Sequence, residues 1–168
     1  MKIGIITDAL DDSNAGISVY TENLVKNILE LDKENEYVLI HHTKSSKEIY
    51  NLTKELIVPF KKIPFAREYR KIIELPKILE KENFDIIHET TQIGPFFKKS
   101  RFKKIVTVHD LTPLKFPKSH SFISVIHHKL GLKKILKNVD KIIAVSESTK
   151  KDILGFFDVN ACKIKVIY

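Results

Sequence analysis

The chain has 168 residues, 43% hydrophobic and 30% charged, which fits one globular domain. Its single cysteine, Cys162, excludes an internal disulfide and suits a reducing compartment. No apolar run approaches the roughly 20 residues that span a bilayer, and the N-terminus reaches Asp8 too early for the apolar core of a signal peptide. We therefore expect a cytoplasmic domain.

The net charge of +8 is concentrated in one quarter of the sequence. Between Phe96 and Lys137 there are eleven Lys and Arg residues, and Asp110 is the only acid, so this segment carries +10 and the remainder −2. Such a local excess predicts an anionic partner near this segment.

Short apolar runs alternate with helical patterns along the first half of the chain. We predict strands at 2–7 and 36–42, separated by a polar loop and a helix that ends near residue 32. A short helix is expected at 46–56, followed by irregular chain at 59–64. Residues 67–82 have helical spacing, with a kink or break expected at Pro76.

The second half continues the same alternation. Helices are predicted at 119–137 and 147–156, and strands at 84–89, 103–110, 140–146 and 163–168. The strands at 84–89 and 103–110 are apolar on both faces, which suits a parallel sheet covered by helices on both sides. The pattern therefore predicts a single α/β domain over residues 1–168, with an open, doubly wound, mostly parallel sheet of the Rossmann kind.

Polar residues gather where these strands end. In such sheets ligands bind beyond the carboxyl ends of the strands, so we predict a binding site at this edge. The strand KKIVTV stops abruptly at His109 and Asp110, and two prolines then predict a loop that is not helical. His109 is the central candidate; the other strand-end residues are Asp8, His41, His42, His88, Glu89, Ser146 and Glu147.

Several common ligand motifs are absent from the sequence. There is no G-x-G-x-x-G after the first strand and no P-loop, which disfavours the usual dinucleotide sites and NTP hydrolysis. There is no D-x-D, Ser146 lacks a glycine-flanked elbow, and the strand-end histidines lack the pattern of a zinc site. Gly16 permits either the close approach of an anion to backbone N–H groups or merely a turn.

The basic segment PFFKKSRFKK interleaves phenylalanines with cations. This pattern favours an interfacial membrane contact, with nucleic-acid binding well behind and a solvated rim as the structural alternative. Burial in the core explains the apolar residues of the helix at 119–137. The residues predicted to contact a membrane or another anion are Phe96, Phe97, Lys98, Lys99, Arg101, Phe102 and Lys103.

Five segments, in the same order and spacing, resemble the retaining glycosyltransferases of family 4. They are AGISVYTENLVKNI, FDIIHETTQIGPF, KIVTVHDLTPLKFP, DKIIAVSESTKKDIL and KIKVIY. The resemblance implies a GT-B architecture, in which two Rossmann-like domains face each other across a cleft. This chain would be the N-terminal, acceptor-side domain, and the nucleotide-sugar-binding C-terminal domain would be absent. One departure is that the usual double glycine is Ala15-Gly16 here.

The same resemblance assigns roles to residues. His109 matches the active-site histidine near the transferred sugar, and Gly16 matches the glycine whose loop approaches the donor diphosphate. Asp110 and Glu89 would border the acceptor pocket.

The implied activity is hexosyl transfer, with mannose as the specific expectation, from a nucleotide sugar to a lipid-linked or saccharide acceptor. It would proceed with retention and without metal or cofactor, in cell-envelope polysaccharide synthesis at the cytoplasmic face of a membrane. The domain alone is expected to be inactive. The alternative is a non-catalytic module that binds carbohydrate or phospholipid.

Overall fold

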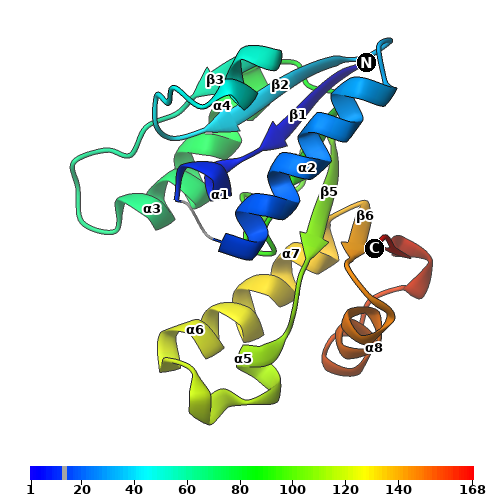
Figure 1. Cartoon of the computed structure of the whole chain (residues 1–168). Coiled ribbons are helices and arrows are strands. Elements are labelled where there is room, and N and C mark those ends of the chain that lie inside the picture. Colours follow the sequence, from blue (N-terminus) through cyan, green and yellow to red (C-terminus); the bar gives the residue numbers. More distant parts are fainter. Residues whose placement is uncertain (13–14) are drawn as a thin grey trace.

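The computed structural model describes residues 1–12 and 15–168. Within these residues seven strands form one sheet in the order β3-β2-β1-β4-β5-β6-β7, and every pair is parallel (Figure 1). This arrangement confirms the predicted doubly wound, Rossmann-like α/β fold. The strands are β1 (Lys2–Ile6), β2 (Glu36–His41), β3 (Lys54–Ile57), β4 (Ile86–Glu89), β5 (Lys103–Val108), β6 (Lys141–Ala144) and β7 (Ile164–Val166).

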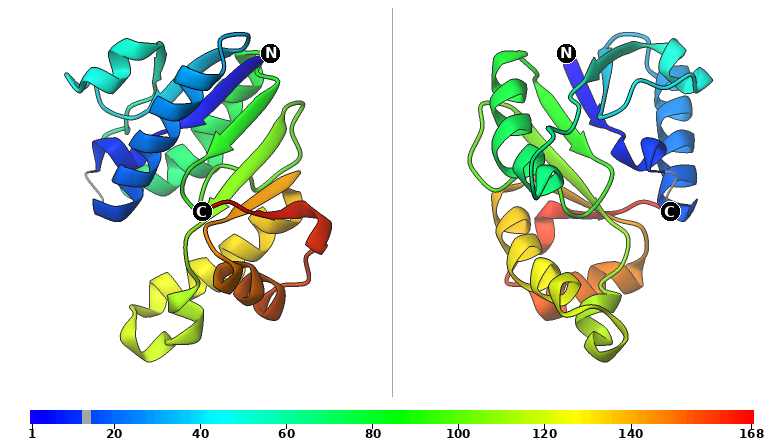
Figure 2. Two further views of the ribbon diagram at one scale, coloured as in Figure 1. Left: turned by 45° about the vertical axis from the view of Figure 1, so that its right-hand side comes forward. Right: turned by 90° about the vertical axis from the view of Figure 1, so that its left-hand side faces the viewer.

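Helices cover both faces of the sheet (Figure 2). Because side chains alternate along a strand, Ile5 packs with α2 (Ala15–Leu31) on one face, and its neighbour Ile6 packs on the other. That second face carries α4 (Leu75–Lys81), α7 (Lys133–Asn138) and α8 (Glu147–Phe156). The remaining helices are α1 (Asp8–Asp11), α3 (Ala66–Tyr69), α5 (Thr112–Lys115) and α6 (Phe122–Ile126).

The short helix predicted at 46–56 is only partly present. A 3-10 helix, η1 (Glu48–Leu52), occupies its first part, and the rest is the edge strand β3. Residues Lys54–Ile57 pair with Val38–His41 of β2, and this tertiary pairing overrides a local pattern that has too few β-branched residues to indicate a strand.

The prolines act differently from the prediction. Pro76 does not break its helix, because a π-helical turn, η2 (Arg70–Glu74), precedes it and accommodates its missing N–H donor. The loop after His109 contains the helical turn α5, because Pro113 lies in its first turn, where no N–H donor is needed. A second π-helical turn, η4 (His127–Leu132), joins α6 to α7.

Candidate functional site

The candidate site lies where the two halves of the sheet diverge. From the central pair β1 and β4, the chain builds outward to β2 and β3 on one side and to β5, β6 and β7 on the other. The carboxyl ends of strands at such a switch point form a crevice. His109 follows β5 at this edge, and its ring meets that of Tyr20 of α2 edge-on, with ring centroids 4.9 Å apart. The structure thus brings His109 beside the first turns of α2, where Gly16 lies.

The His109 ring is held in one tautomer. Its Nε2 lies 2.8 Å from the carbonyl oxygen of Thr90, and because a carbonyl only accepts, Nε2 must carry the proton. In the neutral ring Nδ1 is then an acceptor. The His109 carbonyl oxygen accepts a hydrogen bond from Thr149 Oγ1 at 3.0 Å. The half-buried imidazole is therefore an oriented group at the edge of the sheet.

Gln92 holds the backbone of His109 and Asp110 in place through hydrogen bonds. Its Oε1 accepts the N–H of His109 at 3.1 Å and that of Asp110 at 3.4 Å. Its Nε2 therefore donates to Nε2 of His128 at 2.8 Å, and His128 Nδ1 donates to the Ser124 carbonyl at the same distance. The sequence does not indicate a role for Gln92, since a neutral amide in a loop belongs to no common catalytic or ligand-binding motif.

Glu89 does not border an open pocket, which corrects its predicted acceptor contact. The residue is 2% exposed, and its Oε1 accepts the N–H and the Oγ1–H of Thr91 at 2.9 and 2.8 Å. The loop closes over it so tightly that a Cβ on Gly94 would lie 2.4 Å from Oε2. Burial raises the pKa of Glu89 to about 7. The carboxyl supports loop 90–94, whose Thr90 and Gln92 in turn hold His109.

Asp110 and Gly16 are both open to solvent. Asp110 Oδ1 accepts hydrogen bonds from the N–H and Oγ1 of Thr112 at 2.9 and 2.5 Å. Partial burial raises the pKa of Asp110, but these two hydrogen bonds, together with the nearby His128 and His109, leave the pKa below its usual value. At Gly16 an added Cβ would meet nothing within 4 Å, and φ is not positive. Neither packing nor backbone strain therefore requires a glycine at this position.

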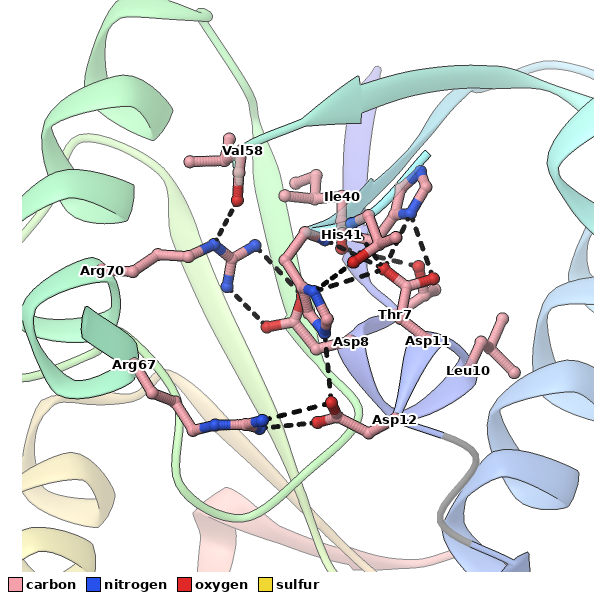
Figure 3. Close-up of polar contacts among 12 residues, drawn as sticks. Thr7, Asp8, Leu10, Asp11, Asp12, Ile40, His41, Val58, Arg67 and Arg70 are labelled. Carbon is pink, nitrogen blue, oxygen red and sulfur yellow. Dashed lines mark hydrogen bonds and ion pairs between the residues drawn. The ribbon is translucent and has the colours of Figure 1, made fainter. Parts of the chain in front are cut away.

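Asp8, at the end of β1, forms a buried ion pair with Arg70 that was not predicted (Figure 3). Arg70 is 0% exposed; its Nη1 and Nη2 donate to the two carboxylate oxygens of Asp8 at 2.6 and 3.0 Å, and its Nε donates to the Val58 carbonyl at 2.5 Å. Removing one partner of such a pair costs about 3–5 kcal/mol. The pair ties the turn η2 to the end of β1, so Asp8 serves structure here.

The strand-end histidines at 41, 42 and 88 are also engaged in the structure. His41 is 0% exposed, with Nδ1 3.1 Å from Asp11 and Nε2 2.9 Å from Glu55. His42 Nε2 lies 3.2 Å from Asp12. His88 Nε2 lies 2.9 Å from Thr107 Oγ1, and burial lowers the pKa of His88 to about 4. Within residues 1–12 and 15–168 no group of three or more His, Cys, Asp and Glu side chains is placed to hold a metal ion.

The predicted membrane contact is wrong for two of its three rings. Phe96 and Phe102 are 1% and 6% exposed and pack in the core, so they cannot enter a bilayer. Arg101 pairs with Glu80 at 3.1 Å, and Lys103 pairs with Asp140 at 3.1 Å. The half-buried Phe97 and the exposed Lys98 and Lys99 line a groove of ≈ 390 Å³ with Ile72, Ile73 and Pro76. For these residues the anion contact stays a prediction. In the part of the chain that the structure describes, no helix is both long and apolar enough to cross a membrane.

The doubly wound parallel sheet, with His109 held at the carboxyl edge of its strands, defines a Rossmann-like α/β domain. The model of Glycosyltransferase Family 4 matches residues 15–168, and the chain belongs to this family. No protein of curated function matches the sequence.

Two solved structures share the fold. The lipopolysaccharide outer core galactosyltransferase WaaB, in its apo form, is 17% identical with a TM-score of 0.61. Alr3699/HepE of Anabaena, in complex with UDP and glucose, is 15% identical with a TM-score of 0.63. The chain is covered completely in both comparisons and spans 45% and 44% of those proteins, so it corresponds to less than half of either. Its fold is that of the Rossmann-like N-terminal domain of GT-B glycosyltransferases.

Proposed function

We propose that the chain is the acceptor-side half of a glycosyltransferase that moves a hexose from a nucleotide sugar to a lipid-linked or saccharide acceptor, with retention. The observation that carries this proposal is the position of His109 at the switch-point edge, beside the start of α2, with its ring fixed by Thr90. Family membership and a neighbour that binds UDP and glucose support a nucleotide sugar as donor. Mannose is the specific expectation from the family resemblance.

In this proposal His109 orients the transferred sugar. Its Nε2 proton is engaged by the Thr90 carbonyl, which leaves Nδ1 to accept a hydrogen bond from a sugar hydroxyl. The exposed carboxylate of Asp110 accepts hydrogen bonds from acceptor hydroxyls. The bare backbone at Gly16 lets the donor diphosphate approach the N-terminus of α2. Such a site lowers the barrier through positioning and electrostatics.

The test is transfer, or slow donor hydrolysis, by the longer protein that contains this chain, with a panel of UDP- and GDP-hexoses. His109→Ala should lower kcat/KM about 100-fold, because it removes a group that orients the reacting sugar. The control is Asn51→Ala, since Asn51 is exposed on η1 and outside the site. Unchanged turnover in His109→Ala would contradict the proposal.

Retention is tested on the product. An NMR coupling constant at the new anomeric centre should show the configuration of the donor. In this proposal the donor-binding half lies in a further domain, so residues 1–168 alone should show no turnover. The alternative, a non-catalytic carbohydrate- or phospholipid-binding module, requires that the longer protein also transfers no sugar from any donor. For a lipid-linked acceptor, the proposed location is the cytoplasmic face of a membrane.

A further inference from the structure

The segment Thr112–Lys134, called here the basic tip, projects beyond the ends of the strands (Figures 1 and 2). It exposes large apolar side chains that a globular domain usually buries. Phe116 is 59% exposed, Phe122 78% and Leu130 64%. Several large apolar side chains exposed in one short segment indicate an interaction site.

The apolar residues of the tip lie along one side of a helix. Phe122, Ile126 and Leu130 follow at steps of four through α6 and η4, and all three are exposed. Farther along the same helix, Leu132 and Leu136 are 0% exposed and face the core. The expectation that core burial explains the apolar residues of 119–137 is therefore correct for the C-terminal part and wrong for Phe122, Ile126 and Leu130.

A groove of ≈ 420 Å³ adjoins this helix. Its apolar wall is formed by α5, α6 and the end of α8, including Val125 and the 46% exposed Phe156. Lys129 and Lys133 are exposed and line the same groove. An apolar cleft with two ammonium groups beside it suits a molecule that combines an apolar chain with a phosphate.

The charge of the tip is of one sign. Between Leu111 and Val139 the chain has six lysines and no acid. Lys115 pairs with Asp152 at 3.0 Å; for Lys118, Lys129 and Lys133 the described part of the chain offers no carboxylate within ion-pair distance. Exposed rings surrounded by unpaired cations complement an anionic bilayer, where the rings enter the headgroup region and the cations meet phosphates.

We propose that the basic tip docks on the surface of an anionic phospholipid bilayer. Phe122 and Leu130 insert at the level of the headgroups, and Lys129 and Lys133 bind lipid phosphates. Membrane docking does not depend on sugar transfer. The two proposals can therefore be tested separately, and either can be refuted without the other. It also places the membrane contact on residues other than the buried Phe96 and Phe102.

The test is flotation of residues 1–168 with vesicles of phosphatidylcholine, with and without phosphatidylglycerol. We expect binding to the anionic vesicles and little to the neutral ones. Lys129→Gln/Lys133→Gln should weaken binding about 25-fold, at roughly fivefold for each lysine near the surface. Phe122→Ser/Leu130→Ser should weaken it at least tenfold. The matched control is Leu31→Ser/Leu52→Ser, which removes two exposed apolar residues outside the tip and outside the groove of Phe97, Lys98 and Lys99.

A spectroscopic readout guards against variants that fail to fold. The chain has no tryptophan, so Phe122→Trp provides a unique fluorophore. Its emission should shift to the blue with anionic vesicles and be quenched by brominated lipid. The absence of both effects, or equal loss of binding in the tip and control variants, would overturn the proposal. A dimer in solution that Phe122→Ser/Leu130→Ser dissociates would assign this face to a second copy of the chain instead.

Discussion

Replacing Glu89 by glutamine should change the stability of the chain in a pH-dependent way. Burial raises the pKa of Glu89 from 4.5 to about 7, and the amide of the Glu89→Gln variant would keep an oxygen to accept the two hydrogen bonds from Thr91. Below pH 4.5 the carboxyl is neutral in both the folded and the unfolded chain. Between pH 4.5 and about 7 the unfolded chain loses its proton first, so the wild type loses stability as the pH rises.

The size of this effect follows from the pKa shift. At about 1.4 kcal/mol per pH unit, the shift corresponds to roughly 3 kcal/mol. The glutamine variant should match the wild type below pH 4.5 and exceed its free energy of unfolding by roughly 3 kcal/mol above about pH 7. In urea the midpoint of unfolding should then rise by about 1–3 M, since m-values of small proteins are roughly 1–3 kcal/mol/M.

The assay is urea unfolding of both proteins at a series of pH values from about 4 to about 8. The difference in the free energy of unfolding between the wild type and Glu89→Gln reports on Glu89 alone, because the two proteins share all other titrating groups. Glu30→Gln is the matched control, since Glu30 is exposed on α2 and should give a flat difference. A flat or falling difference for Glu89→Gln would show that the carboxyl is hydrated or ionised in the folded chain.

Two further predictions address the loops of the site. Gln92→Ala removes the acceptor for the N–H groups of His109 and Asp110, so their amide protons should exchange with solvent about fivefold faster. The amide of Ile87 in β4 should keep its exchange rate and is the control. An unchanged rate at His109 would show that Gln92 does not hold this backbone. Gly16→Ala should raise the free energy of unfolding by up to about 1 kcal/mol, because a Cβ fits there and alanine favours the helix. In the longer protein that the proposed function implies, the same change should weaken nucleotide-sugar binding, measured by calorimetry. Unchanged affinity would leave the glycine without a ligand role.

The fold and the sheet edge where polar residues gather were predictable because they depend on local patterns. Apolar runs broken by polar loops identified the strands at 2–7, 36–42, 84–89 and 103–110 to within a few residues, and parallel strands bring their ends to one edge of the sheet. The abrupt stop at His109 identified the central residue of that edge.

Burial and pairing of individual side chains required the tertiary structure. A phenylalanine flanked by basic residues has a similar sequence signature whether it packs inward, like Phe102, or outward, like Phe116. The partner of Asp8 lies 62 positions away, and the amide that holds His109 lies 17 positions away. The sequence by itself therefore determined the alternation of elements and the edge where their polar ends meet. Only the packing of distant segments decided which of those polar and aromatic side chains are exposed and can contact a ligand. The reason is that burial depends on residues far away in the sequence, which a local pattern does not reveal.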